Sequence, residues 1–281
     1  MVQKNKIELT FFSSGYCTAN QKIVNPTKGS KHIKFYAVWS LLNIPDIGYV
    51  IFDTGYSRQF FNATKTFPDK LYRWATPVFL RKQQSAKSIL ATQGIEAKEI
   101  KYVFISHFHA DHIAGLNDFG NATYLCSKNA YLEVQEKNGF KAVKKGILKK
   151  LLPVDFDKRV NLIENFCEHQ YTDPFNIQHF VPFKNCPEFE LISIEGHAKG
   201  QIGFIVKNES QHIVYATDAS WDKEAFDANI NPFFVVKLFI DSWRELLATQ
   251  DKLRNYLNHY PEAKIVFTHC PQTLELLKNE L

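Results

Sequence analysis

Alternating and uninterrupted apolar stretches, separated by turn-forming residues, indicate a series of strands along the chain. They predict strands at 7–12, 32–42, 48–53, 100–106, 122–126, 189–195, 202–206, 212–217 and 265–268. Helix-like stretches, with their start and stop signals, predict helices at 81–94, 128–137, 238–258 and 272–280. Two strand-rich blocks, each followed by helices, favour an α/β layered sandwich with an approximate internal two-fold.

Two segments fit this pattern less well. Residues 56–80 are aromatic and irregular, contain Pro68 and Pro77, and are expected to form a loop or lid. Residues 138–185 are expected to be a second lid or insertion. Within them, 140–152 has apolar residues at helical spacing and lysines on the other side, which predicts a basic amphipathic helix. Such a helix would face a membrane, a nucleic acid or an anionic substrate, but a solvated face near a site entrance is the interpretation we favour.

The composition of the chain excludes several classes of protein. The chain has 281 residues, 45% of them hydrophobic, which excludes disorder, and no apolar run reaches the length of a membrane span. The net charge is +5, with only six arginines among 34 basic residues, so no nucleic-acid partner is expected. The five cysteines show no CxxC spacing, and we find no signal-peptide pattern. With no internal repeat or linker, we expect one domain over 1–281, in the cytoplasm.

The densest chemical motif follows the expected strand 100–106. It places His107, His109, Asp111 and His112 within six positions. Residues two apart at a strand end point the same way, so His107 and His109 can bind one ion. The chain then turns, and Asp111 and His112 can reach a second ion. Neutral imidazole and carboxylate suit zinc, iron or manganese, so the motif predicts a metal site.

Three further candidates each follow a predicted strand. His197 follows 189–195, Asp218 follows 212–217, and His269 follows 265–268. A single histidine or aspartate of this kind is a weak signal. Their order along the chain and their shared placement at strand ends predict that they complete the coordination begun by the first motif.

These residues, together with Asp53-Thr54-Gly55, resemble in order the metallo-β-lactamase fold superfamily of metal-dependent hydrolases, over nearly the whole chain. The resemblance implies a four-layer αβ/βα sandwich with two divalent ions, most simply Zn²⁺, at one edge between the sheets. It implies one metal held by His107, His109 and His197, and a second held by Asp111, His112 and His269. Asp218 would bridge the two ions, and Asp53 would steady the ligand loop by hydrogen bonds.

Within that superfamily, the layout is most similar to the N-acyl homoserine lactonase branch. Shared features are the spacing from His112 to His197, the Thr-Asp-Ala-Ser run at 217–220 and a helix before the last histidine. One departure concerns the tyrosine that those lactonases carry three residues after the bridging aspartate, where this chain has Trp221. An indole N–H donates one hydrogen bond and cannot also accept one as a phenol does. We therefore expect Trp221 to bind substrate in a different way.

The implied reaction is cleavage of an ester, lactone or thioester by a hydroxide that bridges the two ions. Asp111 would pass a proton to the leaving group. Aromatic side chains flanking the motifs predict a small-molecule substrate with an apolar acyl or aromatic part. These are Tyr56, Phe60, Phe61, Phe67, Tyr72, Trp74, Phe175, Phe180, Phe183, Trp221, Phe226, Phe233 and Phe234.

Three other functions stay open at this point. A phosphodiesterase or nuclease would use the same dinuclear site, a dioxygenase would use a single iron, and a non-enzymatic member would use the site for structure or sensing. The apolar segment 233–240 is compatible with core, pocket wall or the surface of a homodimer, of which core is the simplest.

Overall fold

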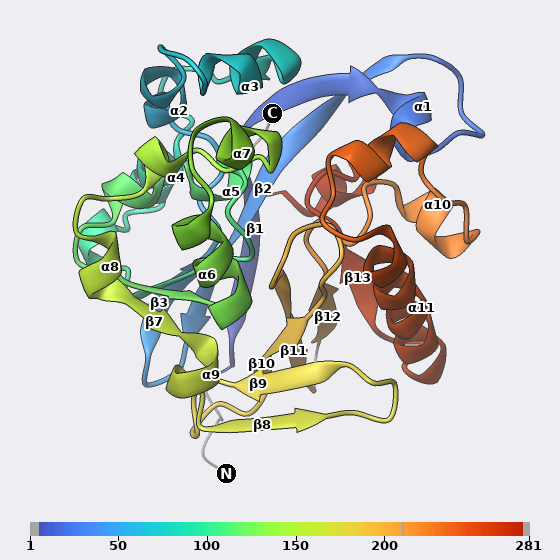
Figure 1. The fold of residues 1–281 in the computed structure, drawn as a ribbon. Coiled ribbons are helices and arrows are strands. Elements are labelled where there is room, and N and C mark those ends of the chain that lie inside the picture. The colour runs from blue at the N-terminus through green and yellow to red at the C-terminus, as the bar shows by residue number, and fades with distance from the viewer. Residues whose placement is uncertain (1–5, 210, 278–281) are drawn as a thin grey trace.

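Two β-sheets lie face to face and helices cover their outer sides (Figure 1). The computed structural model describes residues 6–209 and 211–277. The first sheet has the order β4-β1-β2-β3-β5-β6-β7, in which β1, β2 and β3 pair antiparallel and β3, β5, β6 and β7 pair parallel. Its strands are β1 (Glu8–Asn20), β2 (His32–Ile44), β3 (Gly48–Phe52), β4 (Val78–Phe79), β5 (Tyr102–Phe104), β6 (Thr123–Cys126) and β7 (Val160–Leu162).

The second sheet has the order β13-β12-β11-β10-β9-β8. All of its pairs are antiparallel except β12 with β13, so β10, β12 and β13 run in one direction. Its strands are β8 (His169–Thr172), β9 (Gln178–Val181), β10 (Phe189–Ser193), β11 (Ile202–Asn208), β12 (Gln211–Tyr215) and β13 (Lys264–Val266).

Helices α4, α6 and α8 lie outside the first sheet, whereas α10 and α11 lie outside the second (Figure 1). The α-helices are α1 (Gln21–Val24), α2 (Arg58–Ala63), α3 (Lys70–Ala75), α4 (Ala86–Thr92), α5 (Ala110–Ile113), α6 (Lys128–Glu136), α7 (Gly139–Lys144), α8 (Phe156–Arg159), α9 (Ile163–Phe166), α10 (Lys223–Asp227) and α11 (Trp243–His259). The 3₁₀ helices are η1 (Ala97–Glu99), η2 (Leu116–Asp118), η3 (Lys149–Leu151), η4 (Phe234–Leu238) and η5 (Pro271–Leu276).

Aromatic side chains fill the space between the sheets. The ring of Phe52 on β3 lies 5.0 Å from that of Phe204 on β11 and 5.7 Å from that of Tyr215 on β12. All three side chains are fully buried, so they exclude water from the contact between the layers. With helices outside both sheets, this contact confirms the four-layer sandwich that the sequence resemblance implied.

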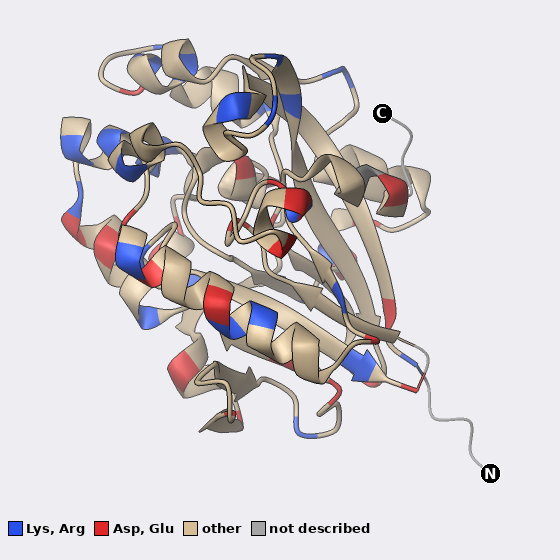
Figure 2. Cartoon of the chain, turned by 90° about the vertical axis from the view of Figure 1, so that its right-hand side faces the viewer, with Lys and Arg blue, Asp and Glu red and all other residues tan. Residues whose placement is uncertain are grey.

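Acidic and basic residues both lie along α11, the long helix that crosses the front of Figure 2. Its buried positions Leu253 and Tyr256 pack with residues of the second sheet, which is the expected pattern for a helix that covers one side of a sheet. Among the described residues, no helix combines the length and the apolar character that crossing a lipid bilayer requires.

Several predicted helices are shorter in the structure. Only α4 lies within 81–94, because Gln83 has a positive φ of 64° and the helix begins after its N-cap Ser85. The helix expected over 238–258 is α11, which begins after its N-cap Ser242. The helix expected over 272–280 is the 3₁₀ helix η5, and the end of that range lies outside the described residues.

The helix expected over 140–152 is wrong as a continuous element. The helix α7 ends at Lys144, a turn follows at Gly146 with φ +73°, and η3 begins at Lys149. Ile147 and Leu148 are nevertheless buried in the core outside the first sheet. These two apolar residues are therefore buried, as their helical spacing suggested, although the backbone bends at Gly146 and forms no continuous helix.

The two segments that were expected to be lids or insertions contain more regular structure than expected. Residues 56–80 form α2, α3 and the short strand β4 rather than a loop. Residues 138–185 contain β7, β8 and β9, which were not predicted. All four residues of β8 are exposed, so no alternation of apolar and polar residues marks it. The segment 233–240 is divided: Val236 and Ile240 are buried, whereas Phe234 and Leu238 are more than 60% exposed.

Candidate metal centre

Five strands running in one direction end at the edge of the sandwich where the candidate site lies. In the first sheet β3 leads to Asp53 and β5 leads to His107, and these strands are parallel neighbours. In the second sheet β10 leads to His197, β12 to Asp218 and β13 to His269. Side chains far apart in sequence therefore meet because the strands that carry them share an end, as the sequence predicted.

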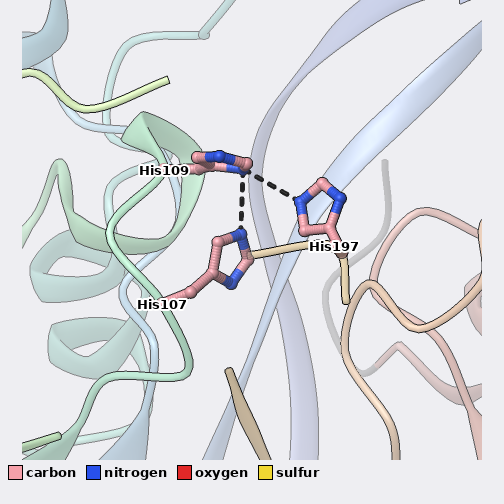
Figure 3. Close-up of side chains that lie close together, drawn as sticks. All are labelled: His107, His109 and His197. Atoms are coloured by element: carbon pink, nitrogen blue, oxygen red, sulfur yellow. Dashed lines mark hydrogen bonds between the residues drawn. The ribbon is translucent and has the colours of Figure 1, made fainter. Parts of the chain in front are cut away.

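The first group consists of three histidines whose ring nitrogens converge (Figure 3). Nδ1 of His109 lies 3.0 Å from Nε2 of His107 and 2.9 Å from Nε2 of His197. Two nitrogens bound to one tetrahedral zinc ion are separated by about 3.4 Å. The observed separations are close to that value, so the three nitrogens suit a single ion.

The second group consists of Asp111, His112 and His269, which offer one atom each within 4.8 Å of one another. Nε2 of His269 lies 3.1 Å from Oδ2 of Asp111, and Nε2 of His112 lies 3.7 Å from the same oxygen. Both histidines are buried, and Asp111 is 7% exposed. This arrangement offers a nitrogen, a nitrogen and an oxygen to a second ion.

Asp218 lies between the two groups. Its Oδ2 is 3.4 Å from Nε2 of His197 and 3.2 Å from Nε2 of His269, while its Oδ1 is 3.6 Å from Nε2 of His112. One carboxylate therefore reaches histidines from both groups. That position is the one that the sequence resemblance assigned to a bridging ligand.

The outward nitrogens of three histidines are held by oxygen atoms. Nδ1 of His112 lies 2.7 Å from Oδ2 of Asp53, and Nδ1 of His269 lies 2.8 Å from the Tyr36 carbonyl oxygen. Nδ1 of His107 lies 3.0 Å from the Ser106 hydroxyl. A proton on each Nδ1 leaves the lone pair of Nε2 directed into the site, which is the usual support of a metal-binding histidine.

Some buried atoms at the centre lack a partner. Within residues 6–209 and 211–277, Nε2 of His112, Oδ1 of Asp218 and Nδ1 of His197 have no hydrogen bond. Buried polar atoms are nearly always paired, so such orphans require an explanation. Two of these three atoms point to where ions would bind, and the donor set of imidazole nitrogens and carboxylate oxygens fits divalent metal ions.

The histidines of the first group are neutral at physiological pH. Burial lowers the pKa of His107 well below its usual value, and nearby histidines lower it further. Burial also lowers the pKa of His109, and it lowers that of His197 to about 3. Neutral imidazole is the form that binds metal, so these side chains are ready to act as ligands without losing a proton.

The carboxylates of the centre are ionised. Burial alone would raise the pKa of Asp218, but His269 and His112 outweigh it and hold that pKa well below the usual range. The pKa of Asp111 is lowered against burial in the same way. Two negative charges buried together require positive charge nearby. Either protonated imidazoles or divalent cations can supply it.

Residues after β3 fix the loop that carries the first motif. Asp53 accepts hydrogen bonds from the Ser106 backbone N–H at 2.8 Å and from the Ser106 hydroxyl at 2.7 Å. The backbone N–H and the hydroxyl of Thr54 both donate to the carbonyl of His112, each at 2.8 Å. Gly115 packs so closely on Thr54 that a Cβ there would lie 2.9 Å from the threonine Cβ. The short helix α5 is therefore held in place by contacts to the residues before it, at Ser106, and after it, at Gly115.

Aromatic residues line parts of the centre. The Trp221 ring lies 5.3 Å from that of His197, and the Phe35 ring lies 5.9 Å from that of His269. Trp221 is 8% exposed and packs with Val236 and Leu246. The sequence pointed to Trp221, but nothing in its pattern singled out Phe35.

Other aromatic residues that the sequence grouped with the site lie elsewhere. Phe180 and Phe183 are in the core between the sheets, and Phe226 packs on Phe267 behind the second sheet. Phe175 packs on Tyr256 of α11. That part of the expected aromatic lining is wrong, because these side chains fill the core between the sheets or pack behind the second sheet.

Three contacts at the centre were missed from the sequence. Ser106 bridges Asp53 and two histidines, the Tyr36 carbonyl holds His269, and the half-buried Cys17 lies near His269 and Asp111. Burial raises the pKa of the Cys17 thiol to about 11, so it is neutral. Only Ser106, which immediately precedes the histidine motif, carried a signal in the sequence.

Comparison with known proteins agrees with this geometry. A family model described as the metallo-beta-lactamase superfamily matches residues 35–269. An N-acyl homoserine lactonase of Bacillus cereus is 22% identical over 227 residues, which are 80% of each chain.

Solved structures share the fold. An N-acyl homoserine lactone hydrolase with the product N-hexanoyl-L-homoserine bound at its catalytic metal centre superposes with a TM-score of 0.73, at 18% identity over 96% of both chains. The dizinc quorum-quenching lactonase AidC gives a TM-score of 0.64 at 14% identity, covering 96% of this chain and 90% of its own. The matched family model spans every strand end of the centre, and the chain therefore belongs to the metallo-beta-lactamase superfamily, as a metal-dependent hydrolase.

Proposed function

We propose that the chain is a dinuclear metal-dependent lactonase that opens N-acyl homoserine lactones or closely related esters. The observation that carries this proposal is the pair of facing ligand groups with Asp218 between them. The relatives named as N-acyl homoserine lactonases support the bond type. Zn²⁺ is the simplest metal for nitrogen-rich sites of this kind, and iron or manganese would suit the same ligands.

Two groups of side chains would each hold one ion. His107, His109 and His197 would hold one ion and Asp111, His112 and His269 the other, while Asp218 would contribute to both. Asp53 would hold His112 so that its Nε2 faces the site. Bound divalent ions would supply an activated water and polarise the carbonyl oxygen of the ester.

Asp111 would accept and release a proton during the reaction. Its Oδ2 is 3.1 Å from Nε2 of His269, and the two imidazoles beside it keep the carboxylate ionised. An ionised carboxylate next to the scissile bond can take up the proton of the attacking water and pass it to the departing alkoxide oxygen.

Trp221 would bind the substrate through the indole N–H. Its ring packs edge-on against His197, which places it beside the first ligand group. The apolar neighbours of Trp221 and the ring of Phe35 would favour the acyl part of the substrate.

A phosphodiesterase using the same two ions is the main alternative, and a dioxygenase using one iron is another. The second group, Asp111, His112 and His269, favours a dinuclear over a mononuclear enzyme. The lactonase and the phosphodiesterase would use the same two ions, so they are distinguished by which substrate the protein cleaves faster.

Purified protein is expected to contain about two divalent metal ions per chain and to hydrolyse N-hexanoyl-L-homoserine lactone, as followed by proton release. Chelation should abolish the activity and added Zn²⁺ should restore it. Faster cleavage of bis(p-nitrophenyl) phosphate than of the lactone would instead identify a phosphodiesterase. A protein that holds two ions and cleaves neither compound would contradict the proposal.

Asp111→Asn should lower kcat for the lactone about 10²- to 10⁴-fold even at saturating metal, because an amide cannot take up the proton. Turnover and metal content are to be measured on the same sample. Full turnover with both ions bound would show that Asp111 moves no proton.

Asp53→Asn should weaken metal binding about 10- to 100-fold, because the hydrogen bond that orients His112 is weakened. Competition with a chelator measures this change. Asp46→Asn is a matched control, since Asp46 also has a positive φ, 62° against 63°, but lies exposed in the turn between β2 and β3. Equal affinities for the two variants would argue against a supporting role for Asp53.

Trp221→Phe keeps a ring against His197 but removes the N–H. We expect up to about a tenfold fall in kcat/KM, the equivalent of one hydrogen bond, with unchanged metal content. Trp243→Phe removes an indole from the same apolar cluster and should have little effect. A Trp221→Phe enzyme that matches the wild type would mean that the indole N–H does not contact the substrate.

A further inference from the structure

The turn between α7 and η3 brings main chain up to the metal centre. Gly146, with φ +73°, ends the helical run and allows the chain to double back. Ile147 then forms an isolated antiparallel bridge with His109. The turn therefore contacts one of the three histidines of the first group from the outside.

The ring of His109 rests directly on Gly146. A Cβ at this position would lie 2.4 Å from Cδ2 of His109 and 2.7 Å from its Nε2, which is closer than non-bonded atoms approach. Nδ1 of the same ring faces the other two histidines (Figure 3). The turn thus contacts the edge of the ring that faces away from the ligand atoms.

Nδ1 of His109 is left to face the other two histidines, while the turn fixes the opposite edge of the ring by direct contact. For His107, His112 and His269, by contrast, an oxygen atom holds the nitrogen that faces away from the site.

The same turn is tied to the loop that carries His197. Nζ of Lys145 lies 2.8 Å from Oδ1 of Asp241, with both side chains about one-third exposed or less. The backbone N–H of Asp241 in turn donates to the carbonyl of His197 at 2.9 Å. One ion pair therefore connects the support of His109, in the first half of the chain, to the support of His197, in the second.

We propose that Lys145, Gly146 and Asp241 form a brace that positions His109 and His197 for one metal ion, with Gly146 as the positioning residue on which the His109 ring is seated. The proposal rests on the metal centre of the proposed function. It also gives the lysine-rich segment 140–152 a structural task at the site. Only glycine permits both the positive φ and the close approach of the ring.

Gly146→Ala is expected to lower the metal affinity of the first group at least tenfold, because the added methyl group displaces the His109 ring. Chelator competition measures the affinity, and the visible spectrum of the Co²⁺-loaded protein should change. Gly139→Ala is the matched control: Gly139 lies in the same segment with φ +54°, but a Cβ there meets nothing within 4 Å. Its affinity and Co²⁺ spectrum should stay as in the wild type.

Lys145→Met provides a second test if Gly146→Ala fails to fold. Because the ion pair with Asp241 is partly exposed, we expect its loss to lower the metal affinity roughly two- to fivefold. Lys145→Arg should restore the affinity. The brace is refuted if Gly146→Ala binds metal as the wild type does, or if Gly139→Ala weakens binding equally. It is also refuted if Lys145→Met leaves the affinity unchanged. Because the readout is metal affinity, a wild-type protein that binds two ions without opening lactones would contradict the lactonase and leave this test valid.

Discussion

The Asp53 carboxylate accepts three hydrogen bonds at once, and the first half of the metal centre depends on them. It binds the backbone N–H and the hydroxyl of Ser106 and holds Nδ1 of His112. These bonds join the end of β3 to the end of β5 and fix the direction of an imidazole. A fully buried carboxylate is costly to maintain without such partners, so the loop has little freedom to take another shape.

The second half of the centre comes from the other sheet, and the aromatic core keeps the two halves together. Phe52, Phe204 and Tyr215 pack between the sheets below the strand ends. The Tyr215 hydroxyl donates to the Val38 carbonyl at 3.1 Å, which is a direct link from β12 to β2. A rigid contact of this kind holds Asp218 and His269 at a fixed distance from the histidine motif, as a preorganised set of metal ligands requires.

Polar support around the site follows one rule in different forms. Each of three histidines, His107, His112 and His269, turns one nitrogen inward because an oxygen holds the other, and that oxygen comes from a hydroxyl, a carboxylate or a main-chain carbonyl. His197 differs, since its Nδ1 has no partner among the described residues. Its position depends instead on its backbone, through Asp241, and on the ring of Trp221. The brace at Lys145 and Gly146 therefore acts where side-chain support is weakest.

The sequence by itself determined the layers, most strands and the residue types of the centre. Local patterns of apolar residues predict strands. Residues that follow strands running in one direction lie at the same edge of the sheets, so candidate ligands at those positions are expected to meet. The exposed strand β8 could not be predicted in this way, because it has no apolar face. The bend at Gly146 could not be predicted either, because the apolar residues around it keep the spacing of a continuous helix. Only the tertiary structure decided that the Tyr36 carbonyl supports His269 and that the main chain at Gly146 packs on the ring of His109. Every residue carries the same carbonyl group, so its partner is set by the fold and leaves no mark in the sequence.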